Sequence, residues 1–312
     1  MKWLFFIIII LYFSIQNLNA QESQHSVEEI FNHVDIALKK NDNEKAGKLL
    51  KTLRNKPLSD YQKYELQQHL KRISKHQISF GYELISFKKN YPIEKSWNSL
   101  ALEYQYTIAK HTLLGRATYS DRFFTNGILY EIDAYPVMSK NVYGFLSIGA
   151  SNGGFYQKFS AAASVFNNLG KGFEIETGFR YFDFETNSFF TFASGITKYI
   201  GNFYINGRAS LGPNNDVGVF QNYQFTTRYY FENPANYFFI IIGTGISPDD
   251  ISRFPQVISN ASLKAFYTNI GFSKWYGQFA LGTTVGFLSE DLSNNNNGTQ
   301  LLGSINLKYR FY

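Results

Sequence analysis

The chain has 312 residues, a formal net charge of +6, no cysteine, 18% aromatic residues and only 17% charged residues, whereas soluble domains carry roughly 25% charged residues. No apolar run approaches the roughly 20 residues that a membrane-spanning helix needs. This composition disfavours an ordinary cytosolic enzyme and a helical membrane protein, and the lack of cysteine excludes disulfide scaffolds, thiolate metal sites and cysteine nucleophiles.

The first twenty residues have the pattern of a secretory signal peptide. Lys2 provides a positive start, residues 3–13 form an apolar stretch, and Ala20 ends a small-residue site that suits cleavage. An uncleaved membrane anchor is the alternative, but the apolar stretch is shorter than a membrane span. We expect residues 1–20 to be removed and the mature chain to be exported.

Composition divides the mature chain near His76. Residues 21–76 contain three aromatic residues and one glycine, whereas residues 77–312 contain 49 of the 57 aromatic residues and 23 of the 24 glycines. A change this sharp predicts a domain boundary. The net charge of +3 in the first part is ordinary for a solvated surface, so no nucleic-acid partner is expected.

Residues 21–76 are predicted to be helical. Apolar residues recur at helical spacing over 30–38 and 46–53, Pro57 ends the second stripe, and Ser59 or Asp60 can cap a third helix. Three short helices resemble a tetratricopeptide-type repeat with part of a second, and a plain helical spacer is the alternative. Such arrays need about three repeats to bury both helix faces. We therefore expect this periplasmic segment to pack on the second domain or on a periplasmic protein partner.

From Gln77 onward, apolar and polar side chains alternate over long segments. In residues 171–184, Phe173 and Ile175 face one way while Glu174 and Glu176 face the other. Strands of soluble sandwiches usually have about 5 or 6 residues, whereas outer-membrane strands have about 10, with lipid-facing and lumen-facing residues alternating. The pattern predicts an all-β transmembrane barrel over residues 77–312.

We expect about 14 antiparallel strands, with 12 as the alternative because the glycine-rich stretches 141–168 and 260–288 are weakly patterned. The predicted strands are 78–88, 95–107, 110–121, 127–137, 141–150, 158–168, 171–184, 187–199, 201–212, 219–231, 235–247, 260–273, 275–288 and 300–312. Predicted links after even-numbered strands are short and the others are mostly longer, as periplasmic turns and external loops are in outer-membrane barrels. This alternation places the helical segment and the C-terminus in the periplasm.

The last predicted strand ends in aromatic residues. Its apolar face ends at Phe311, and either Phe311 or Tyr312 resembles the terminal aromatic signal that the outer-membrane assembly machinery reads. The predicted partners are therefore outer-membrane lipid and this machinery. The predicted location is the cell outer membrane of a Gram-negative bacterium, with the N-terminal segment in the periplasm.

Several short phrases resemble the YaiO-like outer-membrane β-barrel family in their order and spacing. They are Gly115-Arg116, Asp121-Arg122-Phe123, Glu131 through Tyr135-Pro136, Gly178-Phe179-Arg180-Tyr181, Lys198 through Asn202, Arg228-Tyr229-Tyr230-Phe231 and Gly243 through Asp250. The resemblance covers roughly residues 80–312. It implies an outer-membrane barrel preceded by helical repeats, and it implies no catalytic residues.

The polar faces of predicted strands two to ten carry charged residues that would point into the barrel. They are Glu103, Arg116, Glu131, Asp133, Glu174, Glu176, Arg180, Arg208 and Arg228. Acids and arginines that face each other can form bidentate pairs. One interpretation is a selective pathway or binding site for a polar solute or a sugar polymer, and the other is a polar core that stabilises the barrel. At 14 strands the interior is wide enough for water.

We predict no catalytic, cofactor or metal site. His111, the one histidine of the predicted barrel, lies on the lipid side with no carboxylate nearby in its strand, so it lacks the neighbours of a catalytic triad. The favoured function is a non-enzymatic barrel for passage or surface handling of a polar solute or polysaccharide. The alternatives are a structural or adhesive outer-membrane protein with ligand-binding external loops, and a lipid-modifying barrel enzyme.

Overall fold

The computed structural model describes residues 27–311, apart from positions 41, 54–55, 92–94, 109, 123–124, 186, 216–217, 251–252, 254–255, 257–263 and 293–295. The chain divides into two compact units, one comprising residues 1–75 with 311–312 and the other residues 76–310. The predicted signal peptide, residues 1–20, and the predicted terminal aromatic Tyr312 lie outside the described residues.

The described part of the N-terminal unit contains three helices, over residues 27–39, in α2 (Asn43–Thr52) and in α3 (Asp60–Ile73). α3 begins with a capping box, in which Ser59 Oγ accepts from the Gln62 amide at 3.3 Å and Gln62 Oε1 accepts from the Ser59 amide at 3.0 Å. Such a box satisfies two amides that a helix start leaves unpaired. The three predicted helices are confirmed, whereas the likeness to tetratricopeptide repeats stays a prediction.

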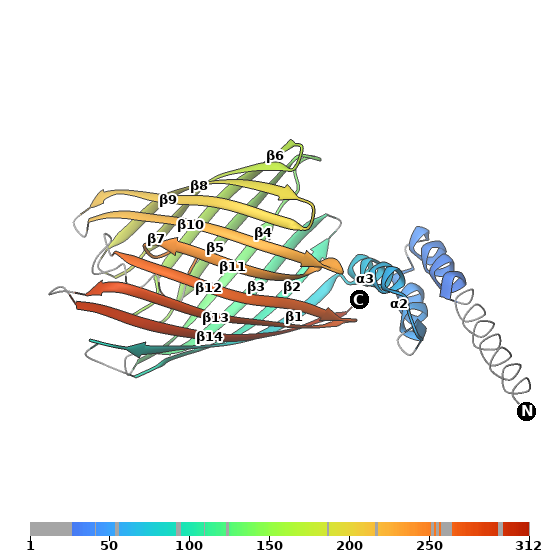
Figure 1. Cartoon of the computed structure of the whole chain (residues 1–312), viewed down its shortest axis with the longest axis horizontal. Helices are drawn as coiled ribbons and strands as arrows, with labels where there is room; N and C mark the ends of the chain where they lie inside the picture. The colour runs from blue at the N-terminus through green and yellow to red at the C-terminus, as the bar shows by residue number, and fades with distance from the viewer. Residues whose placement is uncertain are drawn as a thin grey trace, which may run out of the picture. The chain divides into compact units, whose positions relative to one another are not determined.

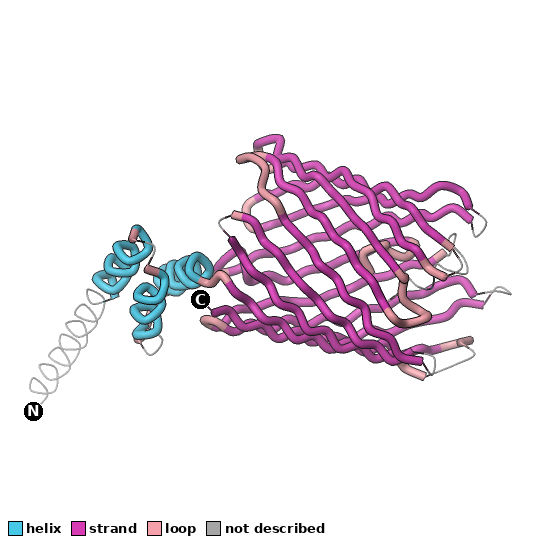
Figure 2. The backbone as a smooth tube through the Cα atoms, turned by 180° about the vertical axis from the view of Figure 1, so that it is seen from behind, coloured by secondary structure: helices cyan, strands magenta, loops and turns pink. Residues whose placement is uncertain are grey.

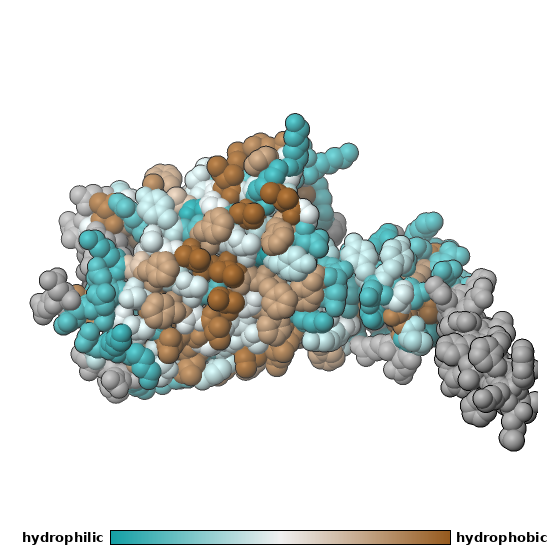
Figure 3. Space-filling view, viewed as in Figure 1, coloured by the Kyte–Doolittle hydropathy of each residue, from teal (hydrophilic) through white to brown (hydrophobic). Residues whose placement is uncertain are grey.

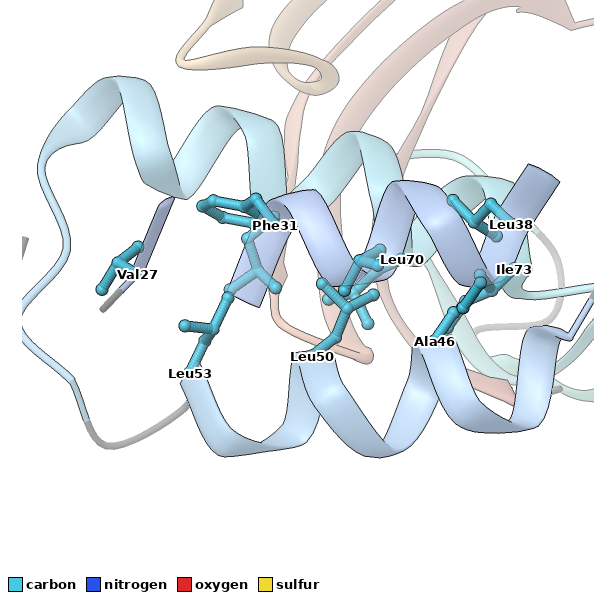
Figure 4. Close-up of a cluster of buried hydrophobic side chains, with 11 residues drawn as sticks. Val27, Phe31, Leu38, Ala46, Leu50, Leu53, Leu70 and Ile73 are labelled. Carbon is cyan, nitrogen blue, oxygen red and sulfur yellow. The ribbon is translucent and has the colours of Figure 1, made fainter. Parts of the chain in front are cut away.

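These helices share one apolar core. Phe31, Leu50 and Ile73, each from a different helix, are almost completely buried and belong to one cluster between the helices (Figure 4). The burial explains why the apolar residues recur at helical spacing, because that spacing places them on one face of each helix. No helix in the described part of the chain is long and apolar enough to cross a membrane.

The second unit is a closed β-barrel of 14 strands in which every consecutive pair is antiparallel and β1 pairs with β14 (Figures 1 and 2). The strands are β1 (His76–Lys88), β2 (Trp97–Ile108), β3 (His111–Arg122), β4 (Thr125–Tyr135), β5 (Val142–Ser151), β6 (Phe159–Gly170), β7 (Phe173–Asp183), β8 (Ser188–Ile200), β9 (Phe203–Asn215), β10 (Gly218–Phe231), β11 (Asn233–Thr244), β12 (Ala265–Tyr276), β13 (Phe279–Leu292) and β14 (Asn296–Phe311). The predicted barrel is confirmed with 14 strands, and the alternative of 12 is wrong.

The two faces of the barrel wall differ in chemistry. Large apolar side chains face outward and remain exposed, among them Leu102 (59%), Phe192 (63%) and Val285 (65%). Apolar side chains gather over the middle of the wall and hydrophilic ones lie toward its ends (Figure 3). Exposing so much apolar surface to water would cost about 25 cal/mol for each Å². The outer face is therefore suited to lipid, as the alternating sequence predicts.

The links between strands differ at the two ends of the barrel. At one end, here called the turn rim, the links are 109–110, 136–141, 171–172, 201–202, 232 and 277–278. The other end, the loop rim, carries the links 89–96, 123–124, 152–158, 184–187, 216–217, 245–264 and 293–295. The longest link, 245–264, joins β11 to β12 at the loop rim. Most long links therefore lie at one end.

Some predicted strand ends are wrong. Predicted strand 12 ended at residue 273, but β12 continues to Tyr276 and the chain turns at Gly277, whose φ of +63° suits glycine. At the loop rim, Asn296 and Asn297 belong to β14 rather than to a loop, because their backbones pair with Leu292 and Asp291 of β13. Backbone pairing thus continues through residues whose side chains are typical of loops.

The barrel also begins earlier than predicted. β1 starts at His76, so the barrel contains two histidines rather than His111 alone. His76 Nδ1 lies 2.7 Å from the Tyr104 hydroxyl, and its ring stacks on Tyr106. His111 Nδ1 accepts a hydrogen bond from the Val137 amide at 3.1 Å. Each imidazole thus has a structural contact at the start of its strand.

We predict that Gly178→Ala destabilises the barrel. Gly178 lies in β7 opposite Ser164 of β6, and a methyl group there would overlap the Ala163 carbonyl oxygen and lie 2.8 Å from Ser164 Cα. Overpacking of this kind costs about 1–3 kcal/mol. The urea midpoint of the folded barrel, followed by its heat-modifiable gel mobility, should fall. Gly207→Ala is the control, because nothing lies within 4 Å of the added methyl group, and equal midpoints for both variants would contradict the prediction.

Candidate functional site: the charged lumen

The first of two charged networks inside the barrel is centred on Arg116 of β3. Its Nε donates to Glu103 Oε2 at 3.2 Å and its Nη1 donates to Glu131 Oε2 at 3.0 Å. Its Nη2 donates to Asp133 Oδ2 at 3.4 Å. The strand register causes this arrangement, because Arg116 lies directly opposite Glu103 on β2 and Glu131 on β4. One guanidinium therefore holds three carboxylates, which leaves a formal excess of negative charge.

The second network lies on β6 to β9. Arg208 of β9 donates from Nη2 to Glu176 Oε1 at 3.0 Å, and this carboxylate also accepts from Ser164 Oγ at 2.9 Å. Arg180 of β7 is 4% exposed, and its Nη1 donates to Ser164 Oγ at 2.9 Å and to the Phe179 carbonyl oxygen at 3.0 Å. Its Nη2 lies 3.7 Å from Glu176 Oε1. Within the strands alone, two arginines share one carboxylate.

A residue of the β11–β12 link supplies the second carboxylate. Arg180 Nε donates to Asp249 Oδ1 at 2.8 Å, and Arg208 Nη1 donates to Asp249 Oδ2. The link leaves β11 through Gly245, whose φ is +73° and where a Cβ would overlap the Gln221 carbonyl oxygen. The link therefore turns sharply at the rim and brings Asp249 into the lumen, where it bridges two arginines.

The charge state of Asp249 follows from its surroundings. Burial by itself raises the pKa of the Asp249 carboxyl, but the guanidiniums of Arg208 and Arg180 lower it by more, so the pKa lies below its ordinary value. A carboxylate with a lowered pKa contributes stability that is present at neutral pH and is lost as the pH falls through that lowered value. Asp249 is therefore a carboxylate at neutral pH, and the second network is formally neutral.

Two cavities lie beside residues 247–250 of the β11–β12 link, here called the inserted segment. The first luminal cavity has a volume of about 520 Å³ and is lined by residues of β3 to β7, β9 and β10 together with Pro248 and Asp249. The second luminal cavity, of about 430 Å³, is lined by residues of β1 and β9 to β14 together with Ser247, Asp249 and Asp250. Arg208 and Asp249 line both cavities. The ion pair between them thus stands where the two cavities meet.

Arg228 of β10 lies in a different environment. Its guanidinium carbon is 5.0 Å from the ring centroid of Tyr204 and 5.1 Å from that of Tyr237. No carboxylate of the described residues lies within 4.0 Å of it. Nearby, Glu174 accepts a hydrogen bond from the Tyr143 hydroxyl at 3.1 Å. Arg228 is thus held by aromatic rings, and its charge is not neutralised by a neighbouring acid among those residues.

Further polar clusters order the loop rim. Arg122, 1% exposed, ends β3, and its guanidinium carbon lies 5.0 Å from the ring centroids of Trp97, Phe155 and Tyr156. The Tyr91 hydroxyl of the β1–β2 link donates to Glu290 of β13. Burial and the neighbouring Glu290 carboxylate raise the pKa of Tyr91, so the phenol remains protonated and can donate. These contacts attach two links of the loop rim to the barrel wall.

Comparison with known families shows to which family the protein belongs. A family model described as the YaiO membrane β-barrel domain matches residues 75–250, more than half of the chain. The chain belongs to this family. The resemblance found in the sequence phrases is therefore confirmed. No curated protein matches the chain.

Solved structures support the fold of this YaiO-family barrel. The monoaromatic hydrocarbon channel CymD has a TM-score of 0.54 at 8% identity, with 80% of this chain and 91% of that chain covered. A deletion mutant of the monoaromatic hydrocarbon channel TodX has a TM-score of 0.51 at 8% identity, with 76% and 91% covered. Identities this low establish a shared fold and no shared substrate. The protein has an outer-membrane barrel fold like that of these two channels, which together with the family supports an outer-membrane location.

The structure brings all nine predicted lumen residues into polar contacts, Arg228 through the Tyr230 hydroxyl. Glu103, Glu131 and Asp133 surround Arg116 in the first network, and Glu176, Arg180 and Arg208 meet in the second. Glu174 contacts Tyr143 instead of an arginine. Arg228 pairs with no carboxylate among the described residues and lies between two tyrosine rings.

The residues that sequence reasoning missed include Asp249, the inward tyrosines and the inward charged residues Glu83 and Arg310. Asp249 stands in Ser247-Pro248-Asp249-Asp250, a phrase typical of turns, so nothing local predicts its contact with strands far away in the chain. Tyr143 and Tyr204 were assigned no role, although they share the polar face of their strands. The alternation could have found these tyrosines, because it places Tyr204 on the same face as Arg208.

We predict that Arg180→Ala destabilises the barrel and that Glu176→Gln partly restores it. Arg180 is buried, and its removal leaves Glu176 and Asp249 with Arg208 as their shared cation. Breaking a buried pair costs about 3–5 kcal/mol, and much less where water fills the site. The urea midpoint of Arg180→Ala in lipid vesicles should fall clearly, and the added Glu176→Gln should raise it again.

The control for this comparison is Lys158→Ala. Lys158 forms an exposed pair with Glu185, in which the two side chains are 59% and 65% exposed, and such surface pairs contribute about 0–1 kcal/mol. An unchanged midpoint for Arg180→Ala, together with a shift of ion selectivity toward cations, would show that the second network is hydrated. Unchanged stability and unchanged selectivity would contradict the luminal position of Arg180.

Proposed function

We propose that the protein is a non-enzymatic outer-membrane barrel for the passage or surface handling of a polar solute or polysaccharide, with a pathway narrowed by the β11–β12 link. The observation that carries this proposal is the position of Asp249. It bridges Arg180 and Arg208 at the junction of two luminal cavities. A pathway interrupted by a few ion pairs can admit small polar solutes while it excludes larger solutes.

The chemistry of the interior supports a polar cargo. The first luminal cavity is lined by Arg116, Glu131, Asp133, Arg180 and Arg208, and such side chains offer donors and acceptors to a hydrated solute. A barrel of 14 strands is wider than the small barrels whose interiors are filled by their own wall side chains. The segment that enters the lumen therefore sets the narrowest point of the pathway.

The sidedness of the barrel is part of this proposal. Short links at one rim and longer links at the other match periplasmic turns and external loops, so we place the turn rim and the helical unit in the periplasm. The outward apolar face binds outer-membrane lipid, and the terminal strand β14 is the contact for the assembly machinery. The helical unit then lies where a periplasmic protein partner can bind it.

The alternative function is a structural or adhesive outer-membrane protein. The contacts that favour it are those of Arg122 and Tyr91, because they order links at the loop rim, where an external ligand would bind. A lipid-modifying enzyme has less support. His111 accepts from the Val137 amide through Nδ1, whereas a triad histidine uses that nitrogen to donate to its carboxylate.

We predict that Asp249→Ala opens the pathway. The substitution removes the carboxylate that Arg180 and Arg208 share, so both guanidiniums lose an ion pair and the inserted segment loses its anchor. Single-channel recordings in planar bilayers should show a higher conductance than the wild type and a selectivity shifted toward anions. Asp250→Ala is the control, because it removes the neighbouring carboxylate and leaves Asp249 in place. The absence of channels in both the wild type and Asp249→Ala would contradict the passage function and leave the structural or adhesive function.

We predict that the β13–β14 link is external. An epitope inserted between Asn294 and Asn295, a sequence stretch with no apolar residue to bury, should leave the barrel intact because exposed links tolerate insertions. Antibody should label intact cells that express this variant. An epitope inserted at Lys171 of the turn rim is the matched control and should be labelled only after permeabilisation. The reverse pattern would invert the proposed topology.

A further inference from the structure

The first luminal cavity has walls of opposite charge. On one side, Glu131 and Asp133 of β4 line it beside Arg116, the single guanidinium that they share with Glu103. This side carries more carboxylates than arginines. On the other side, Arg228 of β10 lines the same cavity. The cavity therefore lies between an acidic wall and a cation.

The cation of Arg228 is not neutralised within the described part of the chain. The neighbouring arginines of this cavity are paired, since Arg180 and Arg208 both contact Glu176 and Asp249. Arg228 instead lies between the Tyr204 and Tyr237 rings at 5.0 and 5.1 Å. Its one further polar contact among the described residues is with the neutral Tyr230 hydroxyl. Ring contacts restrict the guanidinium but remove no charge. A cation in a partly desolvated cavity favours an anionic partner that can accept two parallel hydrogen bonds.

The acidic wall has unused acceptors. Arg116 contacts Oε2 of Glu131 and Oδ2 of Asp133, and no donor among the described residues bonds to the second oxygen of either carboxylate. Each of these oxygens can accept from a ligand. Because three carboxylates share one guanidinium, an ammonium group is favoured there over a neutral donor, and a second anion is disfavoured.

The remaining surface of the cavity is partly apolar. Tyr143 and Phe145 of β5 and Phe166 of β6 line it, and the Tyr143 and Phe166 rings stack at 4.7 Å. Ligand cavities of about 300–1,000 Å³ combine such apolar surfaces with a few oriented polar groups, and this cavity has about 520 Å³. A ligand that fits carries one cationic group and one anionic group together with a small apolar part.

We propose that the first luminal cavity is a binding site for a small zwitterion of amino-acid type. Its carboxylate binds Arg228, its ammonium group binds the free oxygens of Glu131 and Asp133, and its apolar part contacts the rings of Tyr143 and Phe145. The proposal rests on the proposed function, because it names the class of polar solute that the lumen accepts.

Three probes that differ by one charge test the proposal on the full-length barrel in detergent. Leucine carries both charges, N-acetylleucine carries the negative one alone, and leucinamide carries the positive one alone. Isothermal titration calorimetry should show leucine binding at least ten-fold more tightly than either of the others. Equal affinities for the three probes, no binding of leucine, or equally tight binding of the neutral sugar maltotriose would overturn the proposal.

Two variants test the assigned residues. Arg228→Gln should weaken leucine binding at least ten-fold while it leaves the weak binding of leucinamide unchanged. Asp133→Asn should also weaken leucine binding, and it should leave the weak binding of N-acetylleucine unchanged. Arg310→Gln is the matched control, because Arg310 is an inward cation stacked on Trp275 at 3.2 Å and is not among the residues that line the cavity. Unchanged leucine binding by Arg228→Gln contradicts the site. If a variant does not show the heat-modifiable mobility of a folded barrel, the three-probe comparison on the wild type decides.

Failure of this site and failure of the proposed function are distinguishable. Leucine binding in detergent without any conductance in bilayers retains the site and rejects the pathway. Conductance in bilayers with equal affinity for all three probes retains the pathway and rejects the zwitterion site.

Discussion

A β-sheet within a lipid bilayer has to close on itself, because no water is present to satisfy the backbone donors and acceptors of a free edge. Here β1 and β14 pair with each other and leave no edge. Successive residues of a strand point to opposite faces of the sheet. Closure turns one of these faces toward the lumen and the other toward the lipid. The exposed apolar side chains of the outer face and the charged networks of the lumen are both consequences of this single constraint.

Closure creates a second problem inside the barrel. The strands place Arg180 and Arg208 near one carboxylate, Glu176, and an unpaired guanidinium in a narrow interior is costly. The β11–β12 link solves this problem by bringing in Asp249. The same residue that neutralises the wall also occupies the lumen, so charge compensation and partial filling of the lumen are one structural feature. The first network differs, because all four of its side chains come from the strands.

The sequence predicts what depends on local alternation and not what depends on contacts across the lumen. Alternation identified the strands, the outer face and the polar faces, since apolar and polar residues alternate with a period of two within each segment. It could not find Asp249, which is 69 residues from Arg180 and 41 from Arg208 and stands in a turn-like phrase. It also misplaced the end of β12, because Ser273 and Lys274 are typical of turns although their backbones pair with Gly282 and Leu281.

The two networks therefore have different consequences for the protein. The contacts around Arg116 are fixed by the register of β2, β3 and β4, so they persist as long as the barrel is closed. The contacts of Asp249 depend on a link that leaves the wall at Gly245, and their loss would not disturb the strand register. Closure of the barrel and the position of Asp249 in the lumen are thus separable. A barrel built in this way can keep a stable wall whether or not the link is held in the lumen, and under the proposed function the passage of solutes then depends on one carboxylate between two arginines.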